Sequence, residues 1–202
     1  MEAPLKGVIL AGGTGSRLHP LTRITNKHLL PIYDRPMVTY AIEALVRAGV
    51  TELMVVTGGT HAGEFFRLLG NGHEYGIDRL FYAYQEEAGG IAEALGLAER
   101  FVDRDRVLVL LADNVFEASL QPAIEHFRAQ ERGARILLSA VDEPEHLRVV
   151  LDFPLLVHRD PFPFPYRADT VPQHSRPKVV PMRLLVAAAG LVSLLVLILP
   201  LH

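Results

Sequence analysis

Short apolar runs alternate with longer amphipathic stretches along the first three-quarters of the chain. The short runs have the length of buried strands, and the longer stretches repeat their apolar positions with the period of a helix. The pattern predicts strands at residues 7–11, 53–56, 80–84, 107–111 and 134–141, and helices at residues 37–48, 61–69, 91–101 and 120–130. In the helix at 61–69, four side chains are expected to pack inward: Phe65, Phe66, Leu68 and Leu69. Alternating strands and helices are typical of α/β proteins with a parallel sheet.

The last quarter of the chain departs from this alternation. Residues 153–181 are dense in proline and include the sequence PFPFPY, which favours irregular or extended structure over a packed strand. Residues 184–199 are apolar apart from Ser193 and the neutral Gly190. Three interpretations of this apolar segment stay open: a change of reading frame, a membrane tail anchor, or a buried helix. A membrane helix needs about 20 apolar residues, so the segment is at the lower limit of length.

The composition of the chain excludes only a few classes of function. The chain has 202 residues, with 20 Lys and Arg against 23 Asp and Glu, and this balance argues against binding to nucleic acid. It contains no cysteine, which excludes disulfides and thiolate nucleophiles. The nine histidines form no metal-binding motif, and no signal peptide is recognisable at the N-terminus. A cytoplasmic protein is expected, with a membrane tail at residues 184–199 as the lesser alternative.

A glycine-rich turn follows the first predicted strand. Glycines at 12, 13 and 15 leave the backbone N–H groups free to approach an anionic oxygen, and Arg17 and Lys27 supply cations nearby. The segment lacks the last glycine of a dinucleotide-binding fingerprint, and it is not a Walker loop. These residues predict a phosphate-handling site. Taken alone, the glycines are also compatible with a tight turn flanked by solvated basic residues.

Four matches in register identify a family. With GGTGSRL at 12–18, PLT at 20–22, NK at 26–27 and LP at 30–31, the chain resembles the sugar nucleotidyltransferases, most closely the glucose-1-phosphate thymidylyltransferases. The resemblance implies a Rossmann-like, mostly parallel sheet with flanking helices, of the nucleotide-diphospho-sugar transferase type. It also implies a Mg²⁺-dependent transfer from dTTP to glucose 1-phosphate, giving dTDP-glucose and pyrophosphate. UTP is the alternative nucleotide. Whether the chain forms a homo-oligomer stays open.

The resemblance also assigns roles to residues. Arg17 and Lys27 would be catalytic, and Asp113, in the triplet ADN after a strand, would bind Mg²⁺. Gln85 and Gly90, in the segment YQEEAGGIAEA, would recognise the base. The remaining nucleotide-binding positions are Leu10, Gly12, Gly13, Thr14, Gly15 and Ser16. Without the resemblance, Gln85 would be a solvated loop residue and Asp113 a cap of the next turn.

The resemblance ends near residues 144–148. We therefore expect a partial nucleotide-binding domain at 1–148 and a divergent tail at 149–202. The family's sugar contacts and second metal-binding aspartate have no counterpart here, since Asp152, Asp160 and Asp169 lie in no matching context. Three functions stay open: an active transferase, a truncated remnant that binds nucleotide without turnover, and a membrane-tethered nucleotide-binding subunit.

Overall fold

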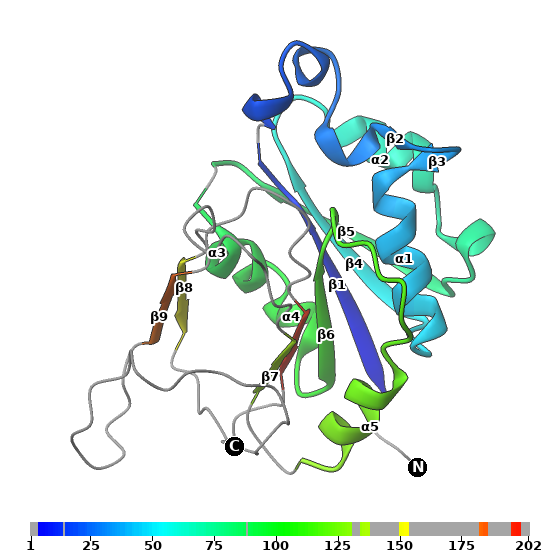
Figure 1. Ribbon diagram of the computed structural model, residues 1–202, viewed down its shortest axis with the longest axis vertical. Helices are drawn as coiled ribbons and strands as arrows, with labels where there is room; N and C mark the ends of the chain where they lie inside the picture. The colour runs from blue at the N-terminus through cyan, green and yellow to red at the C-terminus, as the bar shows by residue number, and fades with distance from the viewer. Residues whose placement is uncertain are drawn as a thin grey trace.

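A computed structural model of the chain describes residues 4–13, 15–87, 89–130, 134–137, 150–153, 182–185 and 195–198. Its main body is a sheet with helices on both faces (Figure 1). The strands of the first 137 residues are β1 (Leu5–Ala11), β2 (Pro31–Ile32), β3 (Arg35–Pro36), β4 (Glu52–Gly58), β5 (Arg79–Gln85), β6 (Arg106–Leu111) and β7 (Ala134–Leu137). The helices are α1 (Met37–Arg47), α2 (Ala62–Leu69), α3 (Ile91–Gly96), α4 (Glu99–Val102) and α5 (Gln121–Arg128).

The central sheet is parallel over four of its strands. The strand order is β5-β4-β1-β6-β10-β7, where β10 is Leu195–Ile198. Strand β1 pairs in parallel with β4 on one side and β6 on the other. In this register Ile9 lies between Val55 and Leu110. Parallel strands buried on both faces read as continuous apolar runs, and this explains why the strands stood out in the sequence.

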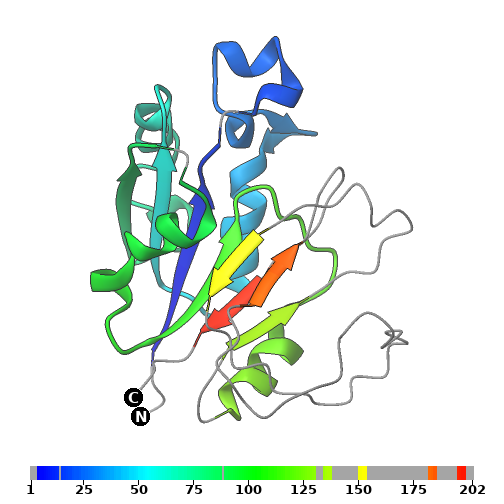
Figure 2. The same cartoon turned by 90° about the vertical axis from the view of Figure 1, so that its left-hand side faces the viewer.

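Alternate side chains of the strands face two separate helical layers. Ile9 belongs to a core cluster that includes residues of α1, α2 and α5, such as Leu45 and Phe127. Its neighbour Val8 belongs to a smaller cluster with Ala94 of α3 and Ala98 beside α4. Figure 2 shows the sheet between these two layers. The predicted α/β fold with a mostly parallel sheet is therefore confirmed.

The helix predicted at residues 91–101 is in fact two short helices. The chain leaves α3 after Gly96, and the Ala98 N–H donates to the Leu95 carbonyl oxygen three residues earlier at 3.0 Å. This tighter turn ends α3 before α4 begins, and glycine is a poor helix former, which favours the break. The apolar period alone did not reveal it.

One side chain of α2 also differs from its prediction. Phe65 and Leu69 are buried, whereas Phe66 is 52% exposed. Its ring stacks on Tyr82 of the edge strand β5 at a centroid distance of 4.0 Å. Adjacent residues of a helix point about 100° apart, so Phe65 and Phe66 could not both face the same core.

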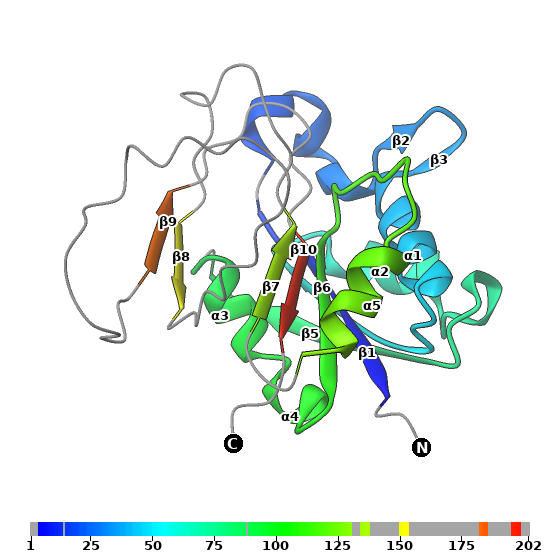
Figure 3. The ribbon, with the colours of Figure 1, turned by 60° about the horizontal axis from the view of Figure 1, so that its bottom comes forward.

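The tail contains strands where irregular structure or an apolar helix was expected. Strand β8 (Val150–Phe153) pairs antiparallel with β9 (Met182–Leu185). Strand β10 (Leu195–Ile198) lies between β6 and β7 and is antiparallel to both (Figure 3). Within the described residues of the apolar segment, 184–185 and 195–198, the helical interpretations are therefore wrong. A short apolar run suits a buried strand as well as a helix, and β6 offers backbone groups that an extended segment pairs with.

The rest of the apolar segment and most of the proline-rich stretch lie outside the described residues. The same holds for residues 138–141 of the last predicted strand. Among the helices that the structure describes, none combines the length and the apolar character needed to cross a membrane.

Candidate functional site

The candidate site lies where the parallel strands end. Strands β1, β4, β5 and β6 all run in the same direction, so their carboxyl ends meet at one edge of the sheet. Ligand crevices of open α/β sheets lie at this edge, between strands whose connections leave to opposite faces. The chain after β1 crosses this edge in three short 3₁₀ turns: η1 (Ser16–Leu18), η2 (Leu21–Arg23) and η3 (Lys27–Leu29) (Figure 1).

A pocket of roughly 340 Å³ opens beside these turns. It is walled by the segments that follow β1, β4 and β5, together with part of the chain between η1 and η3. The predicted site residues Gly12, Gly13 and Gln85 line it. The other lining residues are His19, Thr22, Arg23, Thr25, Asn26, Gly58, Gly59, Thr60, His61, Glu86 and Glu87.

Gly15 allows the turn after β1 to pack closely against η3. Its φ of +60° is in the left-handed region, which favours glycine. A Cβ atom there would lie 2.9 Å from Thr22 Cγ2 and 3.1 Å from Lys27 Cβ. The Gly15 carbonyl oxygen accepts a hydrogen bond from the Thr22 hydroxyl at 2.7 Å. The close packing of the glycine turn therefore fixes the position of the Lys27 backbone.

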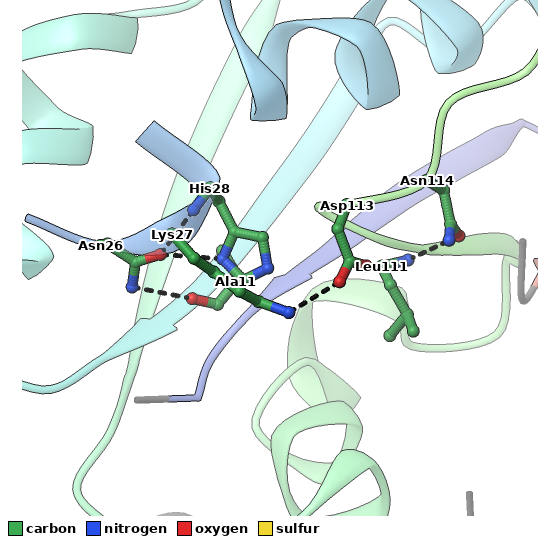
Figure 4. A network of polar contacts seen from close by, with 7 residues as sticks. All are labelled: Ala11, Asn26, Lys27, His28, Leu111, Asp113 and Asn114. Atoms are coloured by element: carbon green, nitrogen blue, oxygen red, sulfur yellow. Dashed lines mark hydrogen bonds and ion pairs between the residues drawn. The ribbon is translucent and has the colours of Figure 1, made fainter. Parts of the chain in front are cut away.

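Lys27 and Asp113 form an ion pair next to this pocket. The Lys27 ammonium donates to Asp113 Oδ2 at 2.6 Å, joining residues that are 86 positions apart in the chain (Figure 4). The side chains are 27% and 35% exposed, so both remain within reach of a ligand. The structure thus brings together a predicted catalytic cation and the predicted metal-binding carboxylate.

Asn26 and His28 fix the position of Lys27 from both sides. Asn26 Oδ1 accepts hydrogen bonds from the His28 backbone N–H at 3.0 Å and from His28 Nδ1 at 2.9 Å. Its amide nitrogen lies 3.5 Å from the Ala11 carbonyl oxygen at the end of β1. Because an amide oxygen only accepts, the His28 proton must be on Nδ1. Asn26 and His28 are buried, and Figure 4 shows them beside the Lys27 side chain.

Asn114 holds Asp113 at the end of β6. Its side-chain Oδ1 accepts from the Leu111 N–H at 3.1 Å, and its own backbone N–H donates to the Leu111 carbonyl oxygen at 3.0 Å. Ala112 is fully buried, and its N–H donates to the Leu10 carbonyl oxygen at 3.0 Å. Its φ is not among the positive values of the described residues, so alanine fits here without backbone strain.

The ion pair and its surroundings shift two pKa values. Burial by itself would raise the pKa of Asp113, but the hydrogen bond and the charge of Lys27 lower it below its usual value. Burial lowers the pKa of His28 from 6.5 to about 4, and the Lys27 charge adds to this, while Asp113 acts in the opposite direction. The site therefore holds an ionised carboxylate beside a neutral imidazole at neutral pH.

The buried imidazole makes the stability of the chain sensitive to acid. The folded-state pKa of His28 lies below the unfolded value, so its contribution is complete above pH 6.5 and is lost as the pH falls towards 4. At about 1.4 kcal/mol per pKa unit, the free energy of unfolding should fall by about 3 kcal/mol over this range because of His28. Urea unfolding of the wild type and of His28→Gln at several pH values measures it.

His73→Gln is the matched control for this measurement, because His73 is exposed. The two stability curves of wild type and His28→Gln should converge at low pH, whereas the His73→Gln curve should follow that of the wild type. Parallel curves for wild type and His28→Gln would contradict a buried, neutral His28.

Gln85 is a buried polar residue that lines the pocket at the end of β5. Its amide nitrogen donates to the Gly90 carbonyl oxygen at 3.3 Å and to Glu93 Oε1 at 3.2 Å. Gly90 precedes α3 with a φ of +93°, a conformation that favours glycine. The two residues expected to recognise the base are therefore in direct contact with each other.

The other predicted residues have different positions. Arg17 and Ser16 lie on the exposed turn η1, and within the described part of the chain Arg17, Lys27 and Asp113 are outside the pocket lining. The Leu10 side chain is 5% exposed and packs in the smaller core cluster, so only its backbone lies near the site. Thr14 lies outside the described residues.

A second polar cluster connects the segment between η2 and η3 to α2. Thr25 donates to Glu64 Oε2 at 2.7 Å, and His61 Nδ1 lies 3.1 Å from Glu64 Oε1. The hydrogen bond from Thr25 lowers the pKa of Glu64, and His61 lowers it further. Because Thr25 and His61 both line the pocket, this cluster fixes one wall.

Several of these supporting residues were not predicted as site residues. Asn26 carried a local signal, since asparagine is favoured as the first residue of a helical turn. The contacts of Glu64 and Glu93 carried none, because they join parts of the chain that only the fold brings together.

The donor atoms at Asp113 suit Mg²⁺. Mg²⁺ usually keeps several waters and is held by one or two carboxylates together with substrate phosphates. Asp113 offers one partly exposed carboxylate that stays ionised at neutral pH. Within the described residues there is no group of three His, Cys, Asp or Glu that would form a complete protein cage. The arrangement fits a metal ion that arrives with a phosphate ligand.

Comparisons with known proteins show which family the chain belongs to. Residues 6–150 match the family model described as Nucleotidyl transferase. The glucose-1-phosphate thymidylyltransferase of Neisseria meningitidis serogroup A is 40% identical over 147 residues, which cover 72% of this chain and 51% of that protein. The enzyme of the same name from Mycolicibacterium smegmatis is 44% identical over 131 residues, covering 64% of this chain and 45% of the other.

A solved structure is similar over most of the chain. It is a crystal structure from Bacillus anthracis, assigned to the glucose-1-phosphate thymidylyltransferases, with a TM-score of 0.73 and 37% identity. The match covers 96% of this chain and 71% of that one. Of the curated relatives from Neisseria meningitidis and Mycolicibacterium smegmatis, by contrast, this chain spans only about half the length.

Proposed function

Because the chain belongs to the nucleotidyl transferase family, we propose that it transfers the nucleotidyl group of dTTP to glucose 1-phosphate, giving dTDP-glucose and pyrophosphate. The observation that carries this proposal is the ion pair of Lys27 and Asp113 beside a pocket lined by Gln85. It provides a cation for phosphate, a carboxylate for a metal ion and an amide for a base within one site.

The reaction places few demands on acid–base chemistry. An oxygen of the sugar phosphate attacks the α-phosphorus, a new P–O bond forms, and the bond to the bridging oxygen of pyrophosphate breaks. The attacking oxygen already carries a negative charge, so no residue has to remove a proton. Catalysis then depends on bringing two polyanions together and compensating their repulsion.

The residues have separate roles in this mechanism. Lys27 would orient the sugar phosphate against the α-phosphate, and Arg17 would hold the triphosphate and the leaving pyrophosphate. Asp113 would hold Mg²⁺, which supplies compensation of the charge that develops on the phosphate oxygens. Asn26 keeps Lys27 in place from the end of β1.

Gln85 and Gly90 would recognise a pyrimidine. An amide both donates and accepts, so Gln85 is suited to the edge of a base, and glycine lets the backbone approach a flat ring. The names of the similar proteins favour dTTP. UTP shares the same base edge and remains the second nucleotide to test.

A second candidate is nucleotide binding without transfer. It is favoured by the pocket lining, which among the described residues includes Gln85 but neither Lys27 nor Asp113. In this case the pocket and the ion pair bind a nucleoside triphosphate, and the sugar phosphate finds no site.

Pyrophosphate release by the purified full-length chain tests the proposal. The reaction contains Mg²⁺ and glucose 1-phosphate with dTTP or UTP, and parallel reactions omit the sugar phosphate or contain a chelator of the metal. Release that needs all three components supports transfer. Saturable binding of dTTP without release would replace it by the second candidate, and absence of both would overturn the two together.

A further inference from the structure

The amide of Gln85 has a fixed orientation. Both partners of its nitrogen, the Gly90 carbonyl oxygen and Glu93 Oε1, are oxygens that accept hydrogen bonds. They use the two protons of the amide nitrogen, which leaves Oε1 as the group available to a ligand. Because Gln85 is only 7% exposed, its side chain has little freedom to exchange these partners for water.

The free oxygen of Gln85 faces the glycine wall of the pocket. A Cβ atom built on Gly12 would lie 3.2 Å from Gln85 Oε1, and both residues line the pocket. Gly12 has no left-handed φ, so what glycine provides here is open space next to the amide oxygen. A flat ring that enters the pocket would meet a hydrogen-bond acceptor at this point.

Glu93 reaches Gln85 because residue 89 is a glycine. It lies on the first turn of α3, and its carboxylate folds back over Gly89. A Cβ atom on Gly89 would lie 1.4 Å from Glu93 Oε2, so a side chain at position 89 would displace the carboxylate. The segment therefore leaves room for Glu93 to contact the base-recognition residue.

We propose that Glu93 is a positioning residue that holds the Gln85 oxygen towards the pocket and so favours a base with an N–H at that position over a base with a lone pair. Thymine and uracil present N3–H to the oxygen, whereas cytosine presents the lone pair of N3, and two acceptors repel. The inference rests on the proposed function only in placing a pyrimidine nucleotide in this pocket.

Loss of Glu93 would weaken the preference without destroying the pocket. Gly90 would remain as the single acceptor for the Gln85 amide nitrogen, so the amide could rotate and present its N–H group to the ligand. One net hydrogen bond corresponds to roughly a 3- to 10-fold change in an equilibrium. We expect the ratio of dTTP to dCTP affinity to fall by roughly that factor in Glu93→Ala.

Calorimetric binding of dTTP and dCTP to the full-length chain with Mg²⁺ measures this ratio. Glu93→Gln should keep the wild-type ratio, because its amide oxygen still accepts from Gln85. Glu99→Ala removes an exposed glutamate from the next helix and should also leave the ratio unchanged. A merely structural role for Glu93 would weaken both nucleotides by the same factor, and an unchanged ratio in Glu93→Ala overturns the proposal.

Gly89→Ala tests the same contact by a different change. The new methyl group would displace the Glu93 carboxylate while leaving it in the chain, and the dTTP to dCTP ratio should fall as in Glu93→Ala. Gly96→Ala is its control, since a Cβ atom there meets nothing within 4 Å. A Gly89→Ala variant with the wild-type ratio would count against the proposal.

These outcomes separate the inference from the proposed transfer. A chain that releases no pyrophosphate but shows the altered ratio in both variants overturns the transfer and supports the role of Glu93. A chain that turns over but keeps its ratio in both variants overturns the role of Glu93 alone. A chain that binds neither nucleotide overturns both.

Discussion

Lys27→Ala is expected to reduce pyrophosphate release by about 10³-fold. The ammonium would compensate charge on two polyanions at the moment when they react, and loss of one such preorganised group typically costs 10²- to 10³-fold in rate. Its buried neighbour His28 is neutral and does not replace this charge. Lys27→Arg should recover part of the rate, since it keeps the charge but changes its geometry. Initial rates with saturating dTTP measure the effect.

Lys6→Ala provides a matched control for Lys27→Ala. Lys6 forms an ion pair with Asp105 at 2.7 Å and also donates to the Phe101 carbonyl oxygen at 2.7 Å. It joins the amino ends of β1 and β6, whereas Lys27 and Asp113 lie at their carboxyl ends. Lys6→Ala removes more contacts, so it should cost at least as much stability and little activity. Equal losses of activity in the two variants would contradict a catalytic role for Lys27.

The sequence predicted the parts of the site that follow single strands. The glycines after β1 and Asp113 after β6 stand at the ends of apolar runs, and parallel strands bring such ends to one edge. Lys27 follows from the same reasoning, because it comes soon after β1. That Lys27 and Asp113 touch could not be predicted, since their contact depends on the path of the three 3₁₀ turns.

The prediction was wrong where one pattern of apolar residues is compatible with two kinds of secondary structure. The apolar residues at 91–101 continue across Gly96, so the break between α3 and α4 was hidden. The apolar run at 184–199 is compatible with a helix or with a buried strand, and its described residues are strands because β9 and β10 find backbone partners. Pairing partners far along the chain decide such cases.

The ion pair between Lys27 and Asp113 occupies the two charges that a bound nucleotide and its metal ion would use. In the structure each neutralises the other, and the pair adds at most about 1 kcal/mol to stability because both side chains are partly exposed. A triphosphate with its metal ion offers a better partner to each: phosphate oxygens to the ammonium and Mg²⁺ to the carboxylate. Binding should therefore open the ion pair and use both charges.

Asp113→Asn is expected to reduce Mg²⁺-dependent transfer strongly while strengthening the binding of nucleotide without metal. The amide is the same size as the carboxylate but has no charge to hold Mg²⁺, and the loss of metal assistance should reduce release by about 10²- to 10⁴-fold. Lys27, no longer neutralised, should bind the triphosphate a few-fold more tightly when the metal is chelated. Calorimetric titration of dTTP with Mg²⁺ and with a chelator measures both effects.

Asp105→Asn is the control, because it breaks the corresponding ion pair with Lys6 at the other end of the sheet. It should leave both the metal dependence and the metal-free affinity of the wild type unchanged. In Asp113→Asn the Mg²⁺-dependent transfer should fall while the metal-free affinity for nucleotide rises. If Asp113 only oriented Lys27, its loss would instead weaken nucleotide binding both with and without metal. Retention of Mg²⁺-dependent release by Asp113→Asn would mean that the metal ion is held elsewhere.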